Sequence, residues 1–455
     1  MTTTIDARPG HDGRGGNHEG GTKHRTVLSS SLIGTTIEWY DFFLYSTAAS
    51  IVFGELFFSA GDGAVGTLAS FATFFVGFLA RPIGAIMFGH IGDRLGRKRT
   101  LVTTMLLMGI ATALIGVLPT YDQAGVLAPA LLVLLRVLQG LAIGGEWAGA
   151  VLLAVEYAPR GRKGFYGSWP QAGLGIGLAL GTGLFALLGE VMDDDAFMTY
   201  GWRIAFGVSI VLVVVGLVIR LKVEETPAFS AVKQRSRLPV AALVRHRLSR
   251  RHLALGMLAR WGDGVAFNTW AVFAIAYCTG LGMSRTSVLL GVTVAAVVMA
   301  VLIPFVGRGV DRLGARRTYI TGMVLFGLSA VPAFLGFRTA DPWVVGAVLV
   351  VTLGIAYAIS YSPEGTLFAQ LFPTETRYTG MSVVYQFSGI YASGLTPMLI
   401  TALFALGGGS LWWVCGYLVF TAVVSTIATL AIRPRDLYLA DDTEQQRDRE
   451  PSRVD

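Results

Sequence analysis

Long apolar stretches recur along almost the whole of this 455-residue chain. A stretch of about 20 apolar residues lets a helix cross the roughly 30 Å hydrocarbon core of a bilayer. Only 14% of the residues are charged, whereas roughly 25% is usual for a soluble domain. The sequence therefore predicts an all-α membrane protein with about twelve transmembrane helices. We place them at 32–53, 66–88, 100–118, 127–150, 166–188, 203–220, 254–279, 286–306, 318–337, 343–362, 380–403 and 411–432.

Basic residues concentrate in alternate connections between these spans. The connections near 94–99, 160–163 and 308–317 are rich in Arg and Lys, whereas 189–197 on the opposite side reads GEVMDDDAF. By the positive-inside rule, this pattern predicts a multi-pass inner-membrane protein with both termini in the cytoplasm. The net charge of +7 then reflects topology, and we expect no nucleic-acid partner.

The residue types that usually form metal or catalytic sites are scarce at membrane depth. Cys278 and Cys415 fall inside expected spans, and all six histidines fall in a tail or in cytoplasmic connections. A nucleophile–base pair or a metal-ligand cluster is not evident in the spans. We therefore expect neither a metal nor a cofactor, and not an enzyme.

An internal repeat divides the chain. GHIGDRLGRKR at 89–99 returns as GRGVDRLGARR at 307–317, with six identical positions and an offset of 307 − 89 = 218. Two related halves predict a cavity between them that opens to one side of the membrane at a time. The expected segments are disordered cytoplasmic tails at 1–24 and 434–455, six-helix halves at 25–221 and 253–433, and a basic cytoplasmic linker at 222–252.

The repeated segment resembles the signature loop between the second and third spans of the major facilitator superfamily. RVLQGLAIGGEW at 136–147 resembles the fourth-span motif of the same superfamily. The resemblance implies the major facilitator fold and a gate at the cytoplasmic helix ends. A basic turn that only sets topology would explain the arginines, but not the aspartate or its duplicate. The gating residues implied are Gly89, Asp93, Arg94, Gly96 and Arg97 in the first copy, and Gly307, Asp311, Arg312 and Gly314 in the second.

Three further segments narrow the resemblance. IEWYDF at 37–42, GGEWAGAVLLAVEYAP at 144–159 and LFPTETRYTGMSVVYQ at 371–386 are together similar to the metabolite:proton symporters of that superfamily. Those proteins carry shikimate, α-ketoglutarate, citrate, or proline and betaine. The short C-terminal tail departs from the osmosensing proline/betaine carriers, which end in a long coiled coil. The resemblance implies secondary active transport and leaves the substrate open.

Charged residues at membrane depth are the candidates for coupling. Arginine does not release a proton, whereas a buried carboxylate can take one up. We therefore expect the proton-coupling residues to be Asp41, Glu38, Glu146 and Asp263, with Glu38 and Asp41 facing the cavity. Asp41, deeper in its span, is the expected titrating group, and Glu38 could instead fix an arginine or the helix packing.

Arginines and nearby polar or aromatic groups are the candidates for binding substrate. An arginine can hold a substrate carboxylate, although Arg136 could instead pair with Asp41 or Glu146, and Arg260 with Asp263. The aromatic and amide groups could equally serve as packing. The expected substrate-binding residues are Arg136, Arg260, Gln139, Tyr40, Trp147, Gln171, Tyr385 and Gln386.

We therefore expect a proton-coupled symporter of a small organic acid that works by alternating access, with the substrate, protons and the bilayer as its partners. One alternative is a zwitterionic osmolyte held by aromatic rings. A more distant alternative is a transporter-like sensor without flux, whose linker binds a regulator. The sequence leaves the oligomeric state open, and a monomer is compatible with it.

Overall fold

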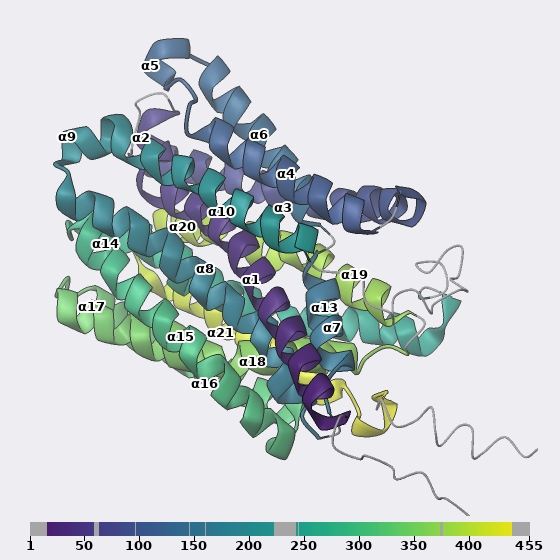
Figure 1. Ribbon diagram of the computed structural model, residues 1–455. Helices are drawn as coiled ribbons and strands as arrows, with labels where there is room; N and C mark the ends of the chain where they lie inside the picture. Colours follow the sequence, from purple (N-terminus) through teal and green to yellow (C-terminus); the bar gives the residue numbers. More distant parts are fainter. Residues whose placement is uncertain are drawn as a thin grey trace, which may run out of the picture.

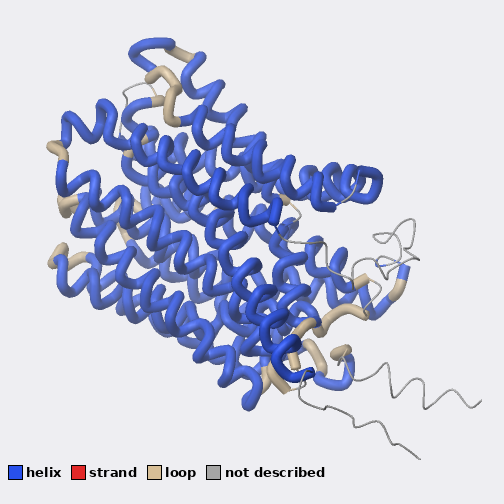
Figure 2. The backbone as a smooth tube through the Cα atoms, viewed as in Figure 1, coloured by secondary structure: helices blue, strands red, loops and turns tan. Residues whose placement is uncertain are grey.

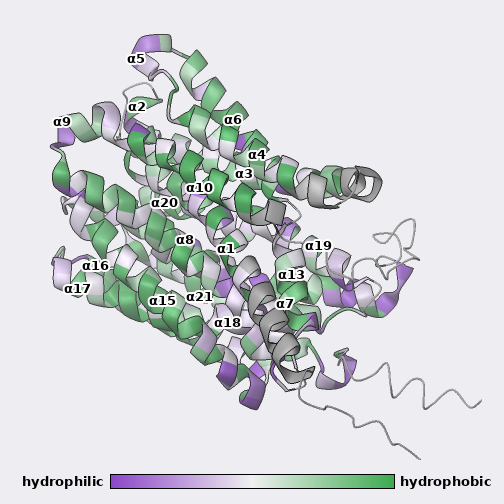
Figure 3. Cartoon of the chain, in the orientation of Figure 1, coloured by the Kyte–Doolittle hydropathy of each residue, from purple (hydrophilic) through white to green (hydrophobic). Residues whose placement is uncertain are grey.

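The computed structural model describes residues 16–58, 63–95, 97–144, 146–159, 161–222, 243, 245–373 and 376–438. Nearly all of these residues lie in long helices joined by short connections (Figure 2). Apolar residues cover the middle of the helices, and polar residues gather toward their ends (Figure 3). This distribution fits helices that satisfy their own backbone hydrogen bonds within a bilayer.

The first half of the chain contains seven long helices among its described residues. They are α1 (Gly16–Ile51), α3 (Gly63–Leu95), α4 (Arg97–Ile115), α6 (Leu127–Ile143), α7 (Glu146–Glu156), α8 (Lys163–Val191) and α10 (Trp202–Lys222). Helices α6 and α7 together form one span. Short elements at one end connect these helices: α2 (Phe53–Leu56), α5 (Tyr121–Ala124), α9 (Asp194–Ala196) and the π-helical turn η1 (Phe197–Gly201).

The second half contains several spans that are interrupted by π-helical turns. Its elements are α13 (Arg247–Asn268), η2 (Thr269–Phe273), α14 (Ala274–Gly280), α15 (Arg285–Leu313), α16 (Ala315–Phe337), α17 (Pro342–Leu349), η3 (Val350–Ala356), α18 (Tyr357–Ala369), α19 (Arg377–Gly389), η4 (Ile390–Gly394), α20 (Thr396–Leu406), α21 (Leu411–Ala431) and the 3-10 turn η5 (Pro434–Asp436). Such π turns are often found at functional sites. Here η2, η3 and η4 interrupt the seventh, tenth and eleventh expected spans.

Within the described residues, nine helices are long and apolar enough to cross a membrane. The other three expected spans coincide with α1, α4 and α13–α14. Helices α1 and α13 carry charged residues at depth, Glu38 and Asp41 in α1 and Arg260 and Asp263 in α13. These charges explain why α1 and α13 are less hydrophobic than the other spans.

The two halves meet closely along α8 and α15, which run side by side (Figure 1). A Cβ added at Gly175 of α8 would lie 2.9 Å from the Cβ of Ala300 in α15. Helix α1 packs on the same helix: a Cβ at Gly177 would lie 2.8 Å from the backbone nitrogen of Tyr40. Small residues in α8 therefore let two neighbouring helices approach it closely, as is common between membrane helices.

The ends of the chain lie at one end of the bundle. Helix α1 begins and α21 ends at the same end of the molecule (Figure 1). Because α1 starts at Gly16, residues 16–24 of the expected tail belong to a helix. Residues 1–15, 223–242 and 439–455, which include most of the expected linker and tails, lie outside the described part of the chain.

Candidate functional site

A small cavity lies between the two halves of the chain. Its volume is about 20 Å³, which is room for about one water molecule. A metabolite therefore enters only after the helices move apart, so this conformation is a closed one. The cavity is lined from the first half by Trp39, Phe42, Phe78, Arg81 and Leu174, and from the second half by Arg260, Gly264, Phe267, Asn268, Tyr357, Tyr385 and Ser393.

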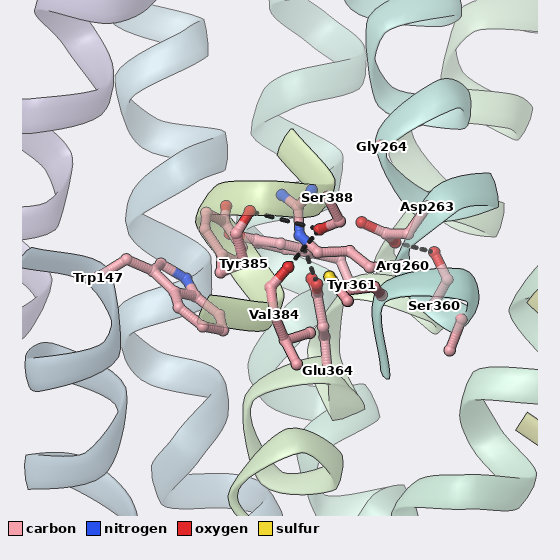
Figure 4. A network of polar contacts seen from close by, with 12 residues as sticks. Trp147, Arg260, Asp263, Gly264, Ser360, Tyr361, Glu364, Val384, Tyr385 and Ser388 are labelled. Carbon is pink, nitrogen blue, oxygen red and sulfur yellow. Dashed lines mark hydrogen bonds and ion pairs between the residues drawn. The ribbon is translucent and has the colours of Figure 1, made fainter. Parts of the chain in front are cut away.

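Arg260 in α13 is the charged centre of the second-half side of the cavity. It is 4% exposed, and its Nε lies 3.1 Å from Oε1 of Glu364 in α18. Its guanidinium carbon lies 3.7 Å from the ring centroid of Tyr385 in α19. Figure 4 shows the three side chains converging. The sequence analysis had left Glu364 unassigned, because its partner is 104 positions away in the chain (364 − 260).

Asp263 lies one helical turn after Arg260 and is also buried. Its carboxylate accepts hydrogen bonds from the hydroxyls of Tyr357 (3.2 Å) and Ser360 (3.1 Å). Figure 4 shows the bond with Ser360. Electrostatic attraction to Arg260 comes from both Asp263 and Glu364. The predicted proximity of Arg260 and Asp263 is present, but the ion pair that forms is the one with Glu364. One guanidinium thus faces two buried carboxyl groups.

Trp147 and Tyr385 form a stacked pair between the two halves. Their ring centroids are 3.8 Å apart and their planes differ by 17°. Tyr385 therefore has two partners in contact with its ring system, Trp147 from α7 and Arg260 from α13. Only Tyr385 of the stacked pair lines the cavity. Trp147 is 2% exposed, so the stack closes the space between α7 and α19.

Two amide side chains strengthen the same contact between the halves. Nε1 of Trp147 donates to Oε1 of Gln171 (3.0 Å), and Nε2 of Gln171 donates to the carbonyl of Tyr361 (3.1 Å). Nε2 of Gln386 donates to the carbonyl of Gly144 (2.6 Å). Gln171 and Gln386, which the sequence analysis placed among the substrate-binding residues, thus connect the halves in this conformation.

Arg136 and Gln139 lie in the first half, apart from the cavity lining. Arg136 donates from Nη1 to Oε1 of Gln139 (3.1 Å), and Gln139 donates to Oγ1 of Thr112 (2.8 Å). The guanidinium carbon of Arg136 lies 4.0 Å from the ring centroid of Tyr45 and 5.0 Å from that of Phe42. An arginine in such a cage is stabilised by cation–π attraction. Phe42 stands between Arg136 and the cavity.

The residues of α1 are arranged differently from the prediction. Glu38 and Asp41 are buried, but the residues of α1 that line the cavity are Trp39 and Phe42. Both carboxylate oxygens of Asp41 are buried without a hydrogen-bond partner, so the alternative pairing of Arg136 with Asp41 is not formed. Tyr40, one of the expected substrate-binding residues, donates its hydroxyl to the carbonyl of Ala205 (3.3 Å) in α10 and does not line the cavity.

Arg81 and Asn268 are among the cavity-lining residues that the sequence analysis did not assign to the site. Arg81 lies with its guanidinium carbon 4.3 Å from the ring centroid of Phe78 and 4.6 Å from that of Phe42. Its Nη2 is buried without a hydrogen-bond partner, and so is Oδ1 of Asn268. Asn268 immediately precedes a π-helical turn, a feature that helical periodicity in the sequence does not reveal.

The second copy of the repeated motif forms a contact between the halves. The carboxylate of Asp311 at the end of α15 accepts hydrogen bonds from the backbone N–H groups of Gly164 (2.7 Å) and Phe165 (3.2 Å) at the start of α8. A carboxylate at a helix N-terminus is electrostatically favourable. Gly314 has a φ of +87° in the turn between α15 and α16, which favours glycine.

The remaining residues of the two motif copies are Gly307, Arg312 and the members of the first copy. Gly307 lies against α8, where an added Cβ would meet Oγ of Ser168. Arg312 lies in the last turn of α15. The first copy falls on residues whose side chains lie outside the described part: Gly89, Asp93, Arg94, Gly96 and Arg97. The same holds for the side chain of Glu146 at the start of α7.

The described residues hold no group of three or more His, Cys, Asp or Glu side chains that could bind a metal ion. What the site does contain is a set of buried arginines and carboxylates between two helical halves that touch. Such a set, on helices that span a membrane, defines a membrane transport protein.

Comparison with known families agrees with this class. Residues 27–242 match the family profile described as "Sugar (and other) transporter", and residues 257–451 match "Major Facilitator Superfamily". The chain belongs to the major facilitator superfamily, a family of transporters rather than enzymes. It is accordingly a multi-pass protein of the inner membrane, as the sequence analysis predicted.

Similar proteins cover almost the whole chain. The chain is 40% identical to "Inner membrane metabolite transport protein YhjE" of Escherichia coli (strain K12), over 89% of this chain and 93% of that protein. It is 39% identical to "Shikimate transporter" of the same strain, over 90% and 95% of the two chains. It is 31% identical to that strain's "Proline/betaine transporter", over 90% and 84%.

Among solved structures, the chain is similar in fold to the xylose transporter XylE of E. coli in a partially occluded inward-open conformation. The TM-score is 0.68 at 15% sequence identity, and the match covers 90% of this chain and 97% of that one. This likeness confirms the predicted major facilitator fold.

Proposed function

We propose that this chain is a proton-coupled symporter that imports a small organic acid by alternating access. The position of Arg81 in the cavity is the observation that carries the proposal. Its guanidinium lines the cavity, and its Nη2 has no hydrogen-bond partner. A guanidinium keeps its charge when buried and matches the geometry of a carboxylate. Arg260 forms an ion pair with Glu364, but its Nη1, like Nη2 of Arg81, is buried without a hydrogen-bond partner. Both guanidinium groups can therefore bind a substrate carboxylate.

The relatives support an organic acid as the substrate class. The similarity to the shikimate transporter is greater than that to the proline/betaine transporter, at 39% against 31% identity. The cavity also contains two arginines, Arg81 and Arg260, which repel each other. An anion bound between them would relieve this repulsion, whereas a ligand with no net charge would relieve less of it.

Proton coupling is assigned to buried carboxyl groups. Asp41 has no hydrogen-bond partner for either carboxylate oxygen, and an ionised carboxylate without a donor is costly to bury. We therefore propose that Asp41 takes up a proton in the closed conformation and releases it when its surroundings open to water. Asp263 and Glu364 share the single cation Arg260 and form a second candidate proton site. Glu38 and Glu146 remain candidates from the sequence.

Alternating access requires contacts that close each side in turn. We propose that both termini lie in the cytoplasm, which places the Asp311–α8 contact and the Trp147–Tyr385 stack on the cytoplasmic side. On the other side, Oγ of Ser50 lies 3.3 Å from the carbonyl of Val272, and Arg285 lies 3.1 Å from Asp194. Contacts between the predicted halves, 25–221 and 253–433, are thus present on both sides of the cavity.

Reconstituted protein tests the proposal. Purified protein in proteoliposomes is given labelled shikimate, with and without an inward proton gradient. We expect the uptake of the wild-type protein to depend on the gradient. Arg81→Gln should bind shikimate at least tenfold more weakly, because a charge-assisted pair is lost. Asp41→Asn should lose the coupling of uptake to the proton gradient. Arg203→Gln is the matched control, because Arg203 donates to the carbonyls of Gly116 and Leu118 outside the cavity. Uptake that ignores the gradient would contradict symport.

The aromatic lining favours a second candidate substrate, a zwitterionic osmolyte. Trp39, Phe42, Phe78, Phe267, Tyr357 and Tyr385 all line the cavity, and such rings can hold a quaternary ammonium group. Labelled betaine in the same proteoliposomes separates the two substrates. Gradient-driven uptake of betaine without uptake of shikimate would favour the osmolyte. Binding of either compound without flux would favour a sensor.

A further inference from the structure

Asn268 presents a buried hydrogen-bond acceptor to the cavity. Its side chain is 2% exposed. Nδ2 donates to the carbonyl of Gly264 (2.8 Å), while Oδ1 has no hydrogen-bond partner. The orientation of the amide follows from chemistry, because a backbone carbonyl only accepts and the amide nitrogen only donates. The nitrogen must therefore face Gly264, and the oxygen is left available to a ligand.

The backbone around Asn268 departs from a regular helix. Asn268 is the last residue of α13 before the π-helical turn η2. Ser393, which also lines the cavity, lies in the π-helical turn η4. Helix α13 lies close to η4, since a Cβ added at Gly264 of α13 would be 2.7 Å from Oγ of Ser393. Asn268, just before one π turn, and Ser393, within another, thus both present polar side chains to the cavity from the second half.

The neighbouring residue shows what a purely structural role requires. Thr269, like Asn268, donates a hydrogen bond to a carbonyl in the preceding turn of the helix: its Oγ1 donates to the carbonyl of Val265 (2.7 Å). Thr269 does not line the cavity. A hydroxyl is therefore enough to make this bond to the preceding turn. The carbonyl oxygen of the Asn268 amide is not needed for that purpose, and leaving it unpaired in a buried site is unfavourable.

We infer that Asn268 selects organic acids that carry a hydroxyl group. The inference rests on the proposed function and adds to it the chemical class of the substrate. The carboxylate of the substrate binds Arg81, and a hydroxyl elsewhere on the same molecule donates to Oδ1 of Asn268. An acid of the same shape without the hydroxyl leaves Oδ1 buried and unpaired. A site built to bond a hydroxyl therefore rejects the analogue that lacks it.

A pair of acids that differ only in their hydroxyl groups tests this inference. Shikimate and 1-cyclohexene-1-carboxylate share the ring and the carboxylate, and the second lacks all three hydroxyls. Binding of each acid to purified full-length protein is measured by calorimetry, and each is tested as a competitor of labelled shikimate uptake. We expect wild-type protein to prefer shikimate by roughly tenfold to a hundredfold, the ratio for one unpaired buried acceptor.

Two variants and one control isolate the role of Asn268. Asn268→Leu keeps the approximate size and removes the acceptor, so it should bring the affinity ratio of the two acids close to one by weakening shikimate. Asn268→Ala should do the same if the leucine variant fails to fold, and the melting temperature of each variant is measured. Thr269→Val removes the neighbouring hydroxyl outside the cavity and should keep the wild-type ratio.

The outcomes separate the two proposals. A wild-type ratio that persists in a folded Asn268 variant would overturn the role of Asn268. A wild-type protein that binds both acids equally would also overturn it, while leaving organic acid transport intact. A wild-type protein that binds neither acid would overturn the proposed function, and the inference with it.

Discussion

Trp147 in α7 and Tyr385 in α19 stack across the interface of the two halves, with ring centroids 3.8 Å apart. The ring of Tyr385 is also contacted by Arg260, whose guanidinium carbon lies 3.7 Å from its centroid. The cavity and the contact between α7 and α19 therefore share one side chain. A ligand that draws Arg260 away from Tyr385 would alter the stack at the same time.

Removal of the stack should favour opening between α7 and α19. Trp147→Leu loses an aromatic pair worth about 0.5–1.5 kcal/mol beyond its buried area. We expect faster alkylation of a cysteine placed at Thr366, which bonds the carbonyl of Lys163 across the halves. The measurement uses a background in which Cys278 and Cys415 are replaced by Ala. Trp412→Leu, at an exposed position, is the control. Equal alkylation rates in the Trp147 variant and the control would contradict the gating role of the stack.

Gly77 in α3 should be intolerant of a side chain because it leaves room for Arg136. A Cβ at Gly77 would lie 2.5 Å from Nε of Arg136. Overpacking of this kind costs about 1–3 kcal/mol, so Gly77→Ala should lower the melting temperature and reduce uptake. Gly207→Ala is the matched control, since a Cβ there meets nothing within 4 Å. If Gly77→Ala behaves like Gly207→Ala, the position of Arg136 is not held by this contact.

The charges of Arg260 and Glu364 should be energetically coupled. Arg260→Met leaves buried carboxyl groups without their cation, which costs about 3–5 kcal/mol for a broken buried pair. Glu364→Gln should recover part of this loss, because it removes one of the stranded charges. We therefore expect the double variant to lose about 0.5–3 kcal/mol less stability than the two single variants lose together. Melting temperatures of the four proteins measure the coupling.

The control for this cycle combines Glu364→Gln with Arg203→Met. Arg203 bonds backbone carbonyls in the first half, so these two changes should be additive. Additivity of the Arg260 and Glu364 variants as well would show that the 3.1 Å contact contributes no coupling energy.

The fold could be predicted from the sequence because it depends on local properties. Apolar length and the repeat at 89–99 and 307–317 are sufficient to indicate the spans and the two halves. Burial of charged side chains such as Arg260 was likewise expected from their positions within apolar stretches. The partner of Arg260 could not be predicted, since Glu364 comes from another helix and spacing along one helix favours Asp263 instead.

The composition of the cavity was harder to predict for a related reason. Which face of a helix meets its neighbours depends on how the helices pack and rotate, so Tyr40 turns toward α10 while Trp39 and Phe42 line the cavity. In the second half, π-helical turns change the register of the helix. Asn268 precedes one of these turns, and a period of 3.6 residues does not show that its side chain reaches the cavity.

Asp311 should hold the halves together at the end of the bundle where α8 begins. Its carboxylate accepts from two backbone N–H groups of the other half, those of Gly164 and Phe165. Asp311→Asn removes the charge, and such helix-terminus interactions are worth about 0.3–1 kcal/mol, or up to about 2 when partly buried. We expect faster alkylation of a cysteine at Thr366 and slower uptake, with little change in melting temperature.

Asp341 offers a matched control for this prediction. It also accepts from two backbone N–H groups at a helix N-terminus, those of Trp343 (2.9 Å) and Val344 (3.0 Å), but both belong to its own half. Asp341→Asn should therefore weaken a local cap and leave uptake and alkylation unchanged. The comparison separates the loss of a cap from the loss of a contact between halves. If both variants slow uptake equally, or neither does, Asp311 does not act as a gate.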